Sequence, residues 1–304
     1  MPEYFSMTVV LAVFYIVFSG QIFLLSIYYP NKISRRVDYT LKNFPPATYP
    51  KLYPAYHIGY VEEEQFKLWL YKAFNYTVAL LGVGILLAMA FSDYRPAAKG
   101  GDETFVMLYF FLQSIPLLYI SLKEHKQYRL MRKTFDDKTR VAELTRRKLF
   151  DFVSPVYVVA AVLLFIAWFI FYAASAGPVS GWESNHYVTA VLIPGLNIFY
   201  AVTIWNYVSG AKLDPYKAPK DQLKQTESVV KVMVFSSIMV SIFLTLTQAA
   251  DQYEFEVLDP VMTSFYMQLC VVFGLGLVMR MQSLEAIDFN VYRIQEGTVV
   301  GQPQ

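Results

Sequence analysis

Two apolar segments of similar sequence decide how we interpret the fold: Val-Met-Leu-Tyr-Phe-Phe-Leu-Gln at 106–113 and Val-Met-Thr-Ser-Phe-Tyr-Met-Gln at 261–268. Val, Met, Phe and Gln recur at the same positions in both. Each segment lies in an apolar run long enough to cross a bilayer as a helix, which takes about 20 residues. We interpret them as the third and seventh transmembrane helices of a protein built from two similar triplets of helices.

The composition of the chain indicates a polytopic membrane protein. Of its 304 residues, 56% are hydrophobic and 16% are charged, whereas about a quarter of the residues of a soluble domain are charged. The apolar residues also gather in runs, so we expect an all-α membrane bundle. The single cysteine, Cys270, excludes an intramolecular disulfide framework and a cysteine-based metal cluster.

Seven apolar segments are long enough to cross a bilayer. We expect them at about 7–29, 71–92, 104–122, 153–176, 187–209, 229–250 and 259–281. The first lacks a basic leader and a small-residue cleavage site, so we expect a true span and not a signal peptide. Residues 1–304 then form one multi-pass integral membrane domain with a short polar cytoplasmic tail at 283–304. We assign the protein to a bacterial inner (plasma) membrane.

The distribution of basic residues predicts the orientation of the bundle. Lys and Arg gather in the loops after the first, third and fifth spans, at about 30–60, 123–150 and 212–224. The alternate loops contain only Arg95 and Lys99 beside several acidic residues. Because cytoplasmic loops carry the excess of Lys and Arg, we expect the N-terminus outside and the C-terminus in the cytoplasm.

The two similar segments suggest a parallel repeat, with halves 7–122 and 187–281 joined by the span at 153–176. Gly20 and Gly195 fall in similar surroundings in the first helices of the two halves. This three-plus-one-plus-three order resembles that of SWEET-type sugar carriers in outline. Their paired Pro-Gln motif is absent here, so the resemblance implies no activity.

The spans contain almost no ionisable residues, which argues against a proton pump, a buried ion relay or a voltage sensor. Their polar residues are neutral, and the candidate ligand-binding residues are Gln21, Gln113, Asn197, Ser237, Ser241, Thr245, Gln248 and Gln268. One interpretation is that these side chains hydrogen-bond between helices. The other is a polar cavity between the two triplets for an uncharged or zwitterionic ligand, with Gln113 and Gln268 on opposite halves.

The sequence offers no catalytic or metal site. His57, His125 and His186 all lie in loops or at span ends, so a haem with two axial histidines across the bundle is not expected. The last span has no central lysine to hold a retinal, and we find no hydrolase or phosphate-binding motif. We therefore expect no cofactor and no enzyme activity.

The first basic loop contains a segment at 44–54 that is rich in proline and aromatic residues. Because proline fixes φ and removes a backbone donor, we expect this segment to be extended and polyproline-like. It could dock a partner protein, form a flap over a cytoplasmic mouth, or serve as a stiff connector on the lipid headgroups. The candidate docking residues are Pro45, Pro46, Tyr49, Pro50, Tyr53 and Pro54.

The second basic loop, at 123–150, is expected to consist of two helical extensions that meet at Asp136 and Asp137. Its basic residues could attract anionic lipid headgroups or an acidic partner protein. Membrane topology already accounts for these charges, so we do not expect nucleic acid binding.

These observations leave two main functional hypotheses. The first is a small-molecule transporter or ligand-binding protein that uses a neutral polar cavity between the triplets. The second is a non-catalytic scaffold or accessory subunit, alone or as a homo-oligomer, that docks partners through the loops at 30–60 and 123–150. A sensor is a third hypothesis, although the sequence provides no output domain.

Overall fold

The computed structural model describes residues 7–92, 94, 103–134, 147–210 and 214–293. Within these ranges the chain forms helices joined by turns and short 3₁₀ segments. Seven helical stretches are long and apolar enough to cross a membrane. They are α1 (Met7–Ile22) continued by the π-helical η1 (Phe23–Tyr28) and α2 (Tyr29–Asn43), α3 (Tyr60–Phe91), α4 (Glu103–Thr134), α5 (Pro155–Ala176), α6 (Ser184–Val208), α7 (Pro219–Gln252), and α8 (Asp259–Val271) continued by the π-helical η6 (Val272–Gly276) and α9 (Leu277–Met281).

Six short 3₁₀ turns lie in the described connections. They are η2 (Pro50–Leu52), η3 (Leu149–Asp151), η4 (Val179–Gly181), η5 (Glu256–Leu258), η7 (Leu284–Ala286) and η8 (Phe289–Tyr292).

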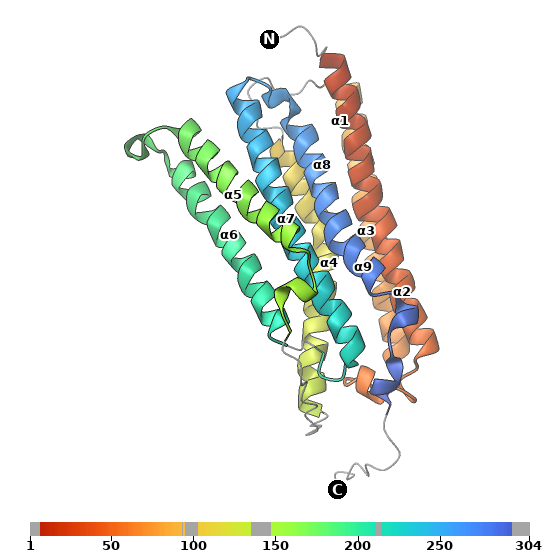
Figure 1. The fold of residues 1–304 in the computed structure, drawn as a ribbon. Helices are drawn as coiled ribbons and strands as arrows, with labels where there is room; N and C mark the ends of the chain where they lie inside the picture. The colour runs from red at the N-terminus through yellow and green to blue at the C-terminus, as the bar shows by residue number, and fades with distance from the viewer. Residues whose placement is uncertain (1–6, 93, 95–102, 135–146, 211–213, 294–304) are drawn as a thin grey trace.

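The long helices run side by side in one bundle (Figure 1). Helix α8 packs against α1 and α4, and α7 packs against α8. Helices α5 and α6 form a hairpin at one side of the bundle, and both pack on α7. The multi-pass architecture predicted from the sequence is therefore supported, with seven candidate spans in the expected order.

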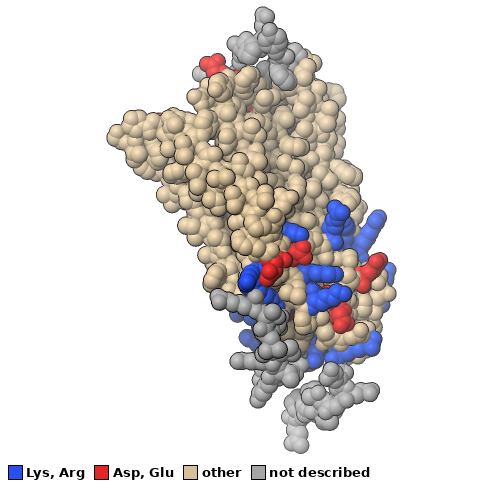
Figure 2. Space-filling view, viewed as in Figure 1, with Lys and Arg blue, Asp and Glu red and all other residues tan. Residues whose placement is uncertain are grey.

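Charged side chains gather at one end of the molecule. Figure 2 shows Lys and Arg around the lower end of the bundle and an uncharged surface along its middle. We call this end, which contains Arg36, Lys123 and Lys217, the basic end. It is the end that the distribution of Lys and Arg predicts to be cytoplasmic.

The helix that contains the first span is longer than expected. It continues to Asn43, whereas the sequence predicted a loop from about residue 30. Tyr29, Ile33 and Leu41 are buried in α2 at 5%, 8% and 8% exposure. Ile33 follows Tyr29 by four residues and Leu41 follows Ile33 by eight, so all three lie on one face of a helix. The basic residues between them lower the hydropathy of the segment but do not interrupt this apolar face.

The proline-rich segment is not extended, contrary to the prediction. The carbonyl oxygen of Pro45 accepts from the amide nitrogens of Thr48 and Tyr49 at 3.1 and 3.0 Å, and η2 follows directly. Tyr49 and Tyr53 are buried at 7% and 5% exposure. The segment folds into turns because its aromatic rings find partners inside the protein.

Those partners belong to residues 283–293, which we call the C-terminal segment. Phe289 stacks on Phe44 with ring centroids 3.7 Å apart. The guanidinium of Arg293 donates to the hydroxyl of Tyr49 at 2.7 Å and lies over its ring. This part of the expected polar tail is therefore packed on the proline-rich segment, which lies near the start of the chain.

Close packing between α3 and α4 depends on a glycine. The hydroxyl of Tyr109 donates to the carbonyl oxygen of Val78 at 2.9 Å and lies directly against Gly82. A Cβ at Gly82 would overlap that hydroxyl oxygen and lie 2.7 Å from Cζ of the Tyr109 ring. Phe14 and Phe18 of α1 complete this core.

Helix α4 continues beyond its expected span to Thr134. This agrees with the first of the two helical extensions predicted for the loop at 123–150. The break predicted at Asp136 and Asp137 lies outside the described residues.

Candidate functional site

Two of the predicted ligand-binding glutamines meet in the middle of the bundle. Side-chain Nε2 of Gln21 donates to side-chain Oε1 of Gln113 at 3.0 Å, and Nε2 of Gln113 donates to Ser26 Oγ at 2.9 Å. Ser264 Oγ, from α8, donates to side-chain Oε1 of Gln21 at 2.6 Å. Gln21 and Gln113 are 0% and 1% exposed. These groups therefore satisfy one another and join the first helix to α4 and α8.

Gln268 also reaches the first helix. Its amide nitrogen donates to the carbonyl oxygen of Val17 at 2.8 Å, and its Oε1 lies against Gly20. Gln113 and Gln268 thus both contact the first helix, whereas we expected them to face a cavity from opposite halves.

The remaining candidates form a second group between α6 and α7. Ser237 Oγ donates to Oδ1 of Asn197 at 2.6 Å. Ser241 and Thr245 each donate to the backbone carbonyl four residues earlier, so their hydroxyls are used within α7. Gln248 lies about two turns beyond Ser241 and is half-buried.

The two groups differ in a way that bears on the repeat. Asn197 precedes an Ile-Phe pair, as Gln21 does. If the halves were equivalent, the bond between Gln21 and Gln113 would therefore have a counterpart between Asn197 and Gln268. Instead, Asn197 bonds to Ser237 and Gln268 bonds to Val17. The hydrogen bonds therefore do not reproduce the similarity of sequence, and the repeat stays a prediction.

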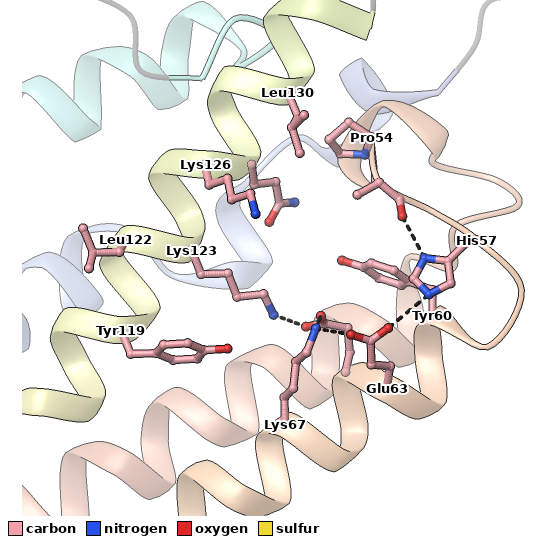
Figure 3. Close-up of a pocket in the computed structure, with 13 residues that line it drawn as sticks. Pro54, His57, Tyr60, Glu63, Lys67, Tyr119, Leu122, Lys123, Lys126 and Leu130 are labelled. Atoms are coloured by element: carbon pink, nitrogen blue, oxygen red, sulfur yellow. Dashed lines mark hydrogen bonds and ion pairs between the residues drawn. The ribbon is translucent and has the colours of Figure 1, made fainter.

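A cleft lies at the basic end between α3 and α4 (Figure 3). On one side of the contact between these helices is a cavity of about 490 Å³, which we call the outer cavity. Its lining includes Ala55, His57, Lys67, Leu122, Lys123 and Lys126. On the other side is a cavity of about 330 Å³, the inner cavity. Its lining includes Arg36, Val37, Leu41, Leu68, Tyr71 and Leu284.

Glu64 lies between the two cavities and lines both. Its side chain is 8% exposed and forms ion pairs with Lys123 of α4 and, at 3.3 Å, with Lys67 one turn along α3. A buried carboxylate is costly unless it is paired, and here two cations meet that requirement. The pair between Glu64 and Lys123 links α3 to α4 at this level.

The proline-rich segment closes one side of the cleft. Gln127 of α4 donates to the carbonyl oxygen of Leu52 at 2.6 Å. Nδ1 of His57 lies 3.1 Å from the carbonyl oxygen of Ala55, and its Nε2 lies 3.0 Å from Oε2 of Glu63. The ring of His57 therefore joins the end of the proline-rich segment to the first turn of α3.

The inner cavity contains a cation and an unused donor. The guanidinium of Arg36 donates to the carbonyl oxygens of Met279 and Gln282 at 3.1 and 2.5 Å. The hydroxyl of Tyr71 is buried and has no hydrogen-bond partner among the described residues. Burial raises the pKa of Tyr53, which lines the same cavity, above its ordinary value.

A polar network fixes the C-terminal segment beside the inner cavity. The hydroxyl of Tyr292 donates to Asp214, and the backbone amide of Asp288 donates to Asp221 Oδ2 at 2.9 Å. Lys217 Nζ donates to Gln225 Oε1 at 2.9 Å. Burial raises the pKa of Tyr292 and lowers that of Lys217. Leu284, which belongs to this segment, lines the inner cavity.

No protein-family model matches the chain, and the comparisons with curated proteins and with solved structures find no match. In the part of the chain that the structure describes, no group of three or more His, Cys, Asp or Glu could hold a metal ion. The function must therefore be argued from the cleft itself.

Sequence reasoning did not identify this cleft. The spacing of Glu63 and Lys67 is that of a helical ion pair, and their 2.5 Å contact forms as such spacing predicts. Glu64 and Lys123 are 59 residues apart. Nothing in a single sequence indicates that these two residues meet.

Proposed function

We propose that this integral membrane protein binds a small amphipathic molecule in the cleft between α3 and α4. The observation that carries the proposal is the pair of cavities on either side of Glu64, each with charged and apolar walls. A ligand site of this kind combines a mostly apolar lining with a few polar groups that orient the ligand.

The walls of the cleft match the two parts of an amphipathic molecule. Lys67 and Lys123 bring positive charge to both cavities, while Val37, Leu41 and Leu68 give the inner cavity an apolar wall. The outer cavity borders side chains on the apolar surface of α4, since Leu122 is 63% exposed. A molecule dissolved in the bilayer could reach the cleft from this side.

The unused hydroxyl of Tyr71 also supports a ligand. A buried hydroxyl without a partner costs free energy, and Tyr71 is 7% exposed at the wall of the inner cavity. A ligand that places an oxygen acceptor near Tyr71 would recover that cost. We expect Tyr71→Phe to leave the free protein folded and to weaken ligand binding.

The middle of the bundle gives less support to a ligand site. The amides of Gln21 and Gln113 and the hydroxyl of Ser264 bond to one another, so a ligand there would have to displace helix-to-helix bonds. We therefore place the ligand at the basic end. The hypothesis of a neutral site around Gln113 and Gln268 is tested by replacing both with Leu and measuring ligand binding.

The first experiment is native mass spectrometry of the protein extracted gently from its membrane. A reproducible small-molecule adduct is expected, and it should be lost in Ala55→Trp, which places a large ring in the outer cavity. Val202→Trp, on the exposed surface of α6, is the matched control and should keep the adduct. An adduct that survives in both variants would place the ligand elsewhere.

One observation favours an accessory-subunit role as the second candidate. The tip of the first basic loop exposes apolar side chains, with Ile58 at 99% and Tyr56 at 55% exposure. Tyr49 and Tyr53 are buried, so a partner at this loop would contact the tip first. Ile58→Asp should then release a copurifying protein, and an unchanged partner would count against the scaffold.

A further inference from the structure

Among the described residues, one cation of the outer cavity has no carboxylate partner. Lys67 pairs with Glu63 and Glu64, and Lys123 pairs with Glu64. Lys126 lines the same cavity one turn from Lys123 and makes no ion pair with the described residues. The cations of this cavity therefore outnumber its carboxylates, and the site favours an anion.

The level of these lysines along the bundle is that of lipid headgroups. Trp69 and Tyr119 are 61% and 53% exposed on α3 and α4, and exposed Trp and Tyr are enriched at the membrane interface. Lys67, Lys123 and Lys126 lie within about two turns of them, towards the basic end. An anionic group held by these lysines would thus lie where phosphate groups lie.

An apolar stripe leads from the bilayer to the outer cavity. Ile115, Leu118 and Leu122 are 51%, 60% and 63% exposed, and their spacing of three and four places them on one face of α4. Leu122 and Tyr119 line the cavity itself. An acyl chain could lie on this stripe while its headgroup occupies the cavity.

We propose that the outer cavity binds the phosphate group of an anionic membrane phospholipid through Lys126 and Lys123, with an acyl chain along the stripe of Ile115, Leu118 and Leu122. The inference rests on the proposed binding function and names the class of ligand. Lys126, which has no ion pair in the described part of the chain, would pair with the phosphate alone, whereas Lys123 would be shared between the phosphate and Glu64.

The test uses the full-length protein in a neutral detergent, titrated with phosphatidylglycerol, phosphatidylcholine or inorganic phosphate. Native mass spectrometry counts bound lipid, and the shift in unfolding temperature reports affinity. We expect one phosphatidylglycerol to bind at least about fivefold more tightly than phosphatidylcholine, since one lysine near a membrane surface has an effect of that size. Inorganic phosphate at millimolar concentration should not displace it, because it lacks the chain.

Two variants separate a built site from general attraction. Lys126→Gln should remove most of the preference for phosphatidylglycerol, while Lys220→Gln, an exposed lysine at the start of α7, should keep it. Equal loss in both variants would overturn the proposal, and so would displacement by inorganic phosphate. Equal binding of the two lipids would also overturn it. In that case, an adduct still lost in Ala55→Trp would leave the proposed function standing.

Discussion

The side-chain amides of Gln21 and Gln113 bond directly across the first helix and α4, with 3.0 Å between Nε2 of Gln21 and Oε1 of Gln113. Each amide has one further partner: Gln21 accepts from Ser264, and Gln113 donates to Ser26. This arrangement makes the pair a fixed crossing point of three helices. Gln113, which the sequence suggested as a ligand-binding residue, therefore contributes to the stability of the bundle.

Gln113→Leu is expected to destabilise the protein by about 1–2 kcal/mol, because it removes the two side-chain bonds from Gln113 to Gln21 and Ser26 and leaves the buried amide donor of Gln21 unpaired. Thermal unfolding in detergent measures the change. Gln248→Leu is the matched control, since Gln248 is half-buried and has no hydrogen bond with the described residues. Equal effects of the two substitutions would contradict the account of the crossing point.

Glu64→Gln is expected to destabilise the basic end by about 2 kcal/mol, because it leaves Lys67 and Lys123 without their shared carboxylate. The loss should be smaller than for a fully buried pair, since Lys67 and Lys123 are about one-third exposed. Chemical unfolding measures the loss. Adding Lys123→Met should recover part of it if the two residues are coupled, and purely additive effects would rule out the coupling.

Gly82→Ala is expected to cost about 1–3 kcal/mol, since the new methyl group would overlap the hydroxyl of Tyr109 in a packed core. Gly84→Ala is a demanding control: it lies two residues away on the same helix, and a Cβ there would meet nothing within 4 Å. Its effect should be neutral or slightly stabilising. Similar losses for both variants would show that helix α3 does not pack on α4 as described.

The docking of the C-terminal segment should depend on pH through Tyr292. Burial raises its pKa in the folded protein above the ordinary 10.0. The contribution of Tyr292 is therefore fully present below pH 10 and is lost as pH rises towards the folded pKa, because the released tyrosine then ionises first. Limited proteolysis of the segment should show this release between about pH 9 and 11, one unit either side of the ordinary pKa.

Tyr292→Phe provides the control for that experiment. It removes the donor to Asp214 and should expose the C-terminal segment to protease already at neutral pH, with a weaker rise above pH 10. Tyr253→Phe changes an exposed tyrosine and should behave as the wild type. A segment that stays resistant in Tyr292→Phe would mean that the stacking of Phe289 on Phe44 is sufficient.

The spans could be predicted from the sequence because each depends on the hydropathy of a continuous run. The helix that continues the first span could not be found by hydropathy, since Arg35 and Arg36 interrupt the apolar run. A test for four-residue spacing would have found it through Tyr29, Ile33 and Leu41. The polar residues of the spans were identified, but their partners were not.

The cleft could not be predicted because it depends on contacts between distant parts of the chain. Glu64 meets Lys123, and the C-terminal segment meets the proline-rich segment. The proline-rich segment was expected to be extended because of its prolines alone. The fold of this segment also depends on the rings of Phe44 and Tyr49, whose partners lie more than two hundred residues later in the chain.

The contact between Arg293 and Tyr49 spans 244 residues and has a consequence for biogenesis. The first helices are made and inserted long before the residues that cover their basic end have been synthesised. Until then Phe44 and Tyr49 are exposed to whatever assists insertion. The last described turn of the chain thus covers the aromatic rings of the first loop. A chain ending after α9 would insert seven helices and leave those rings without their partners.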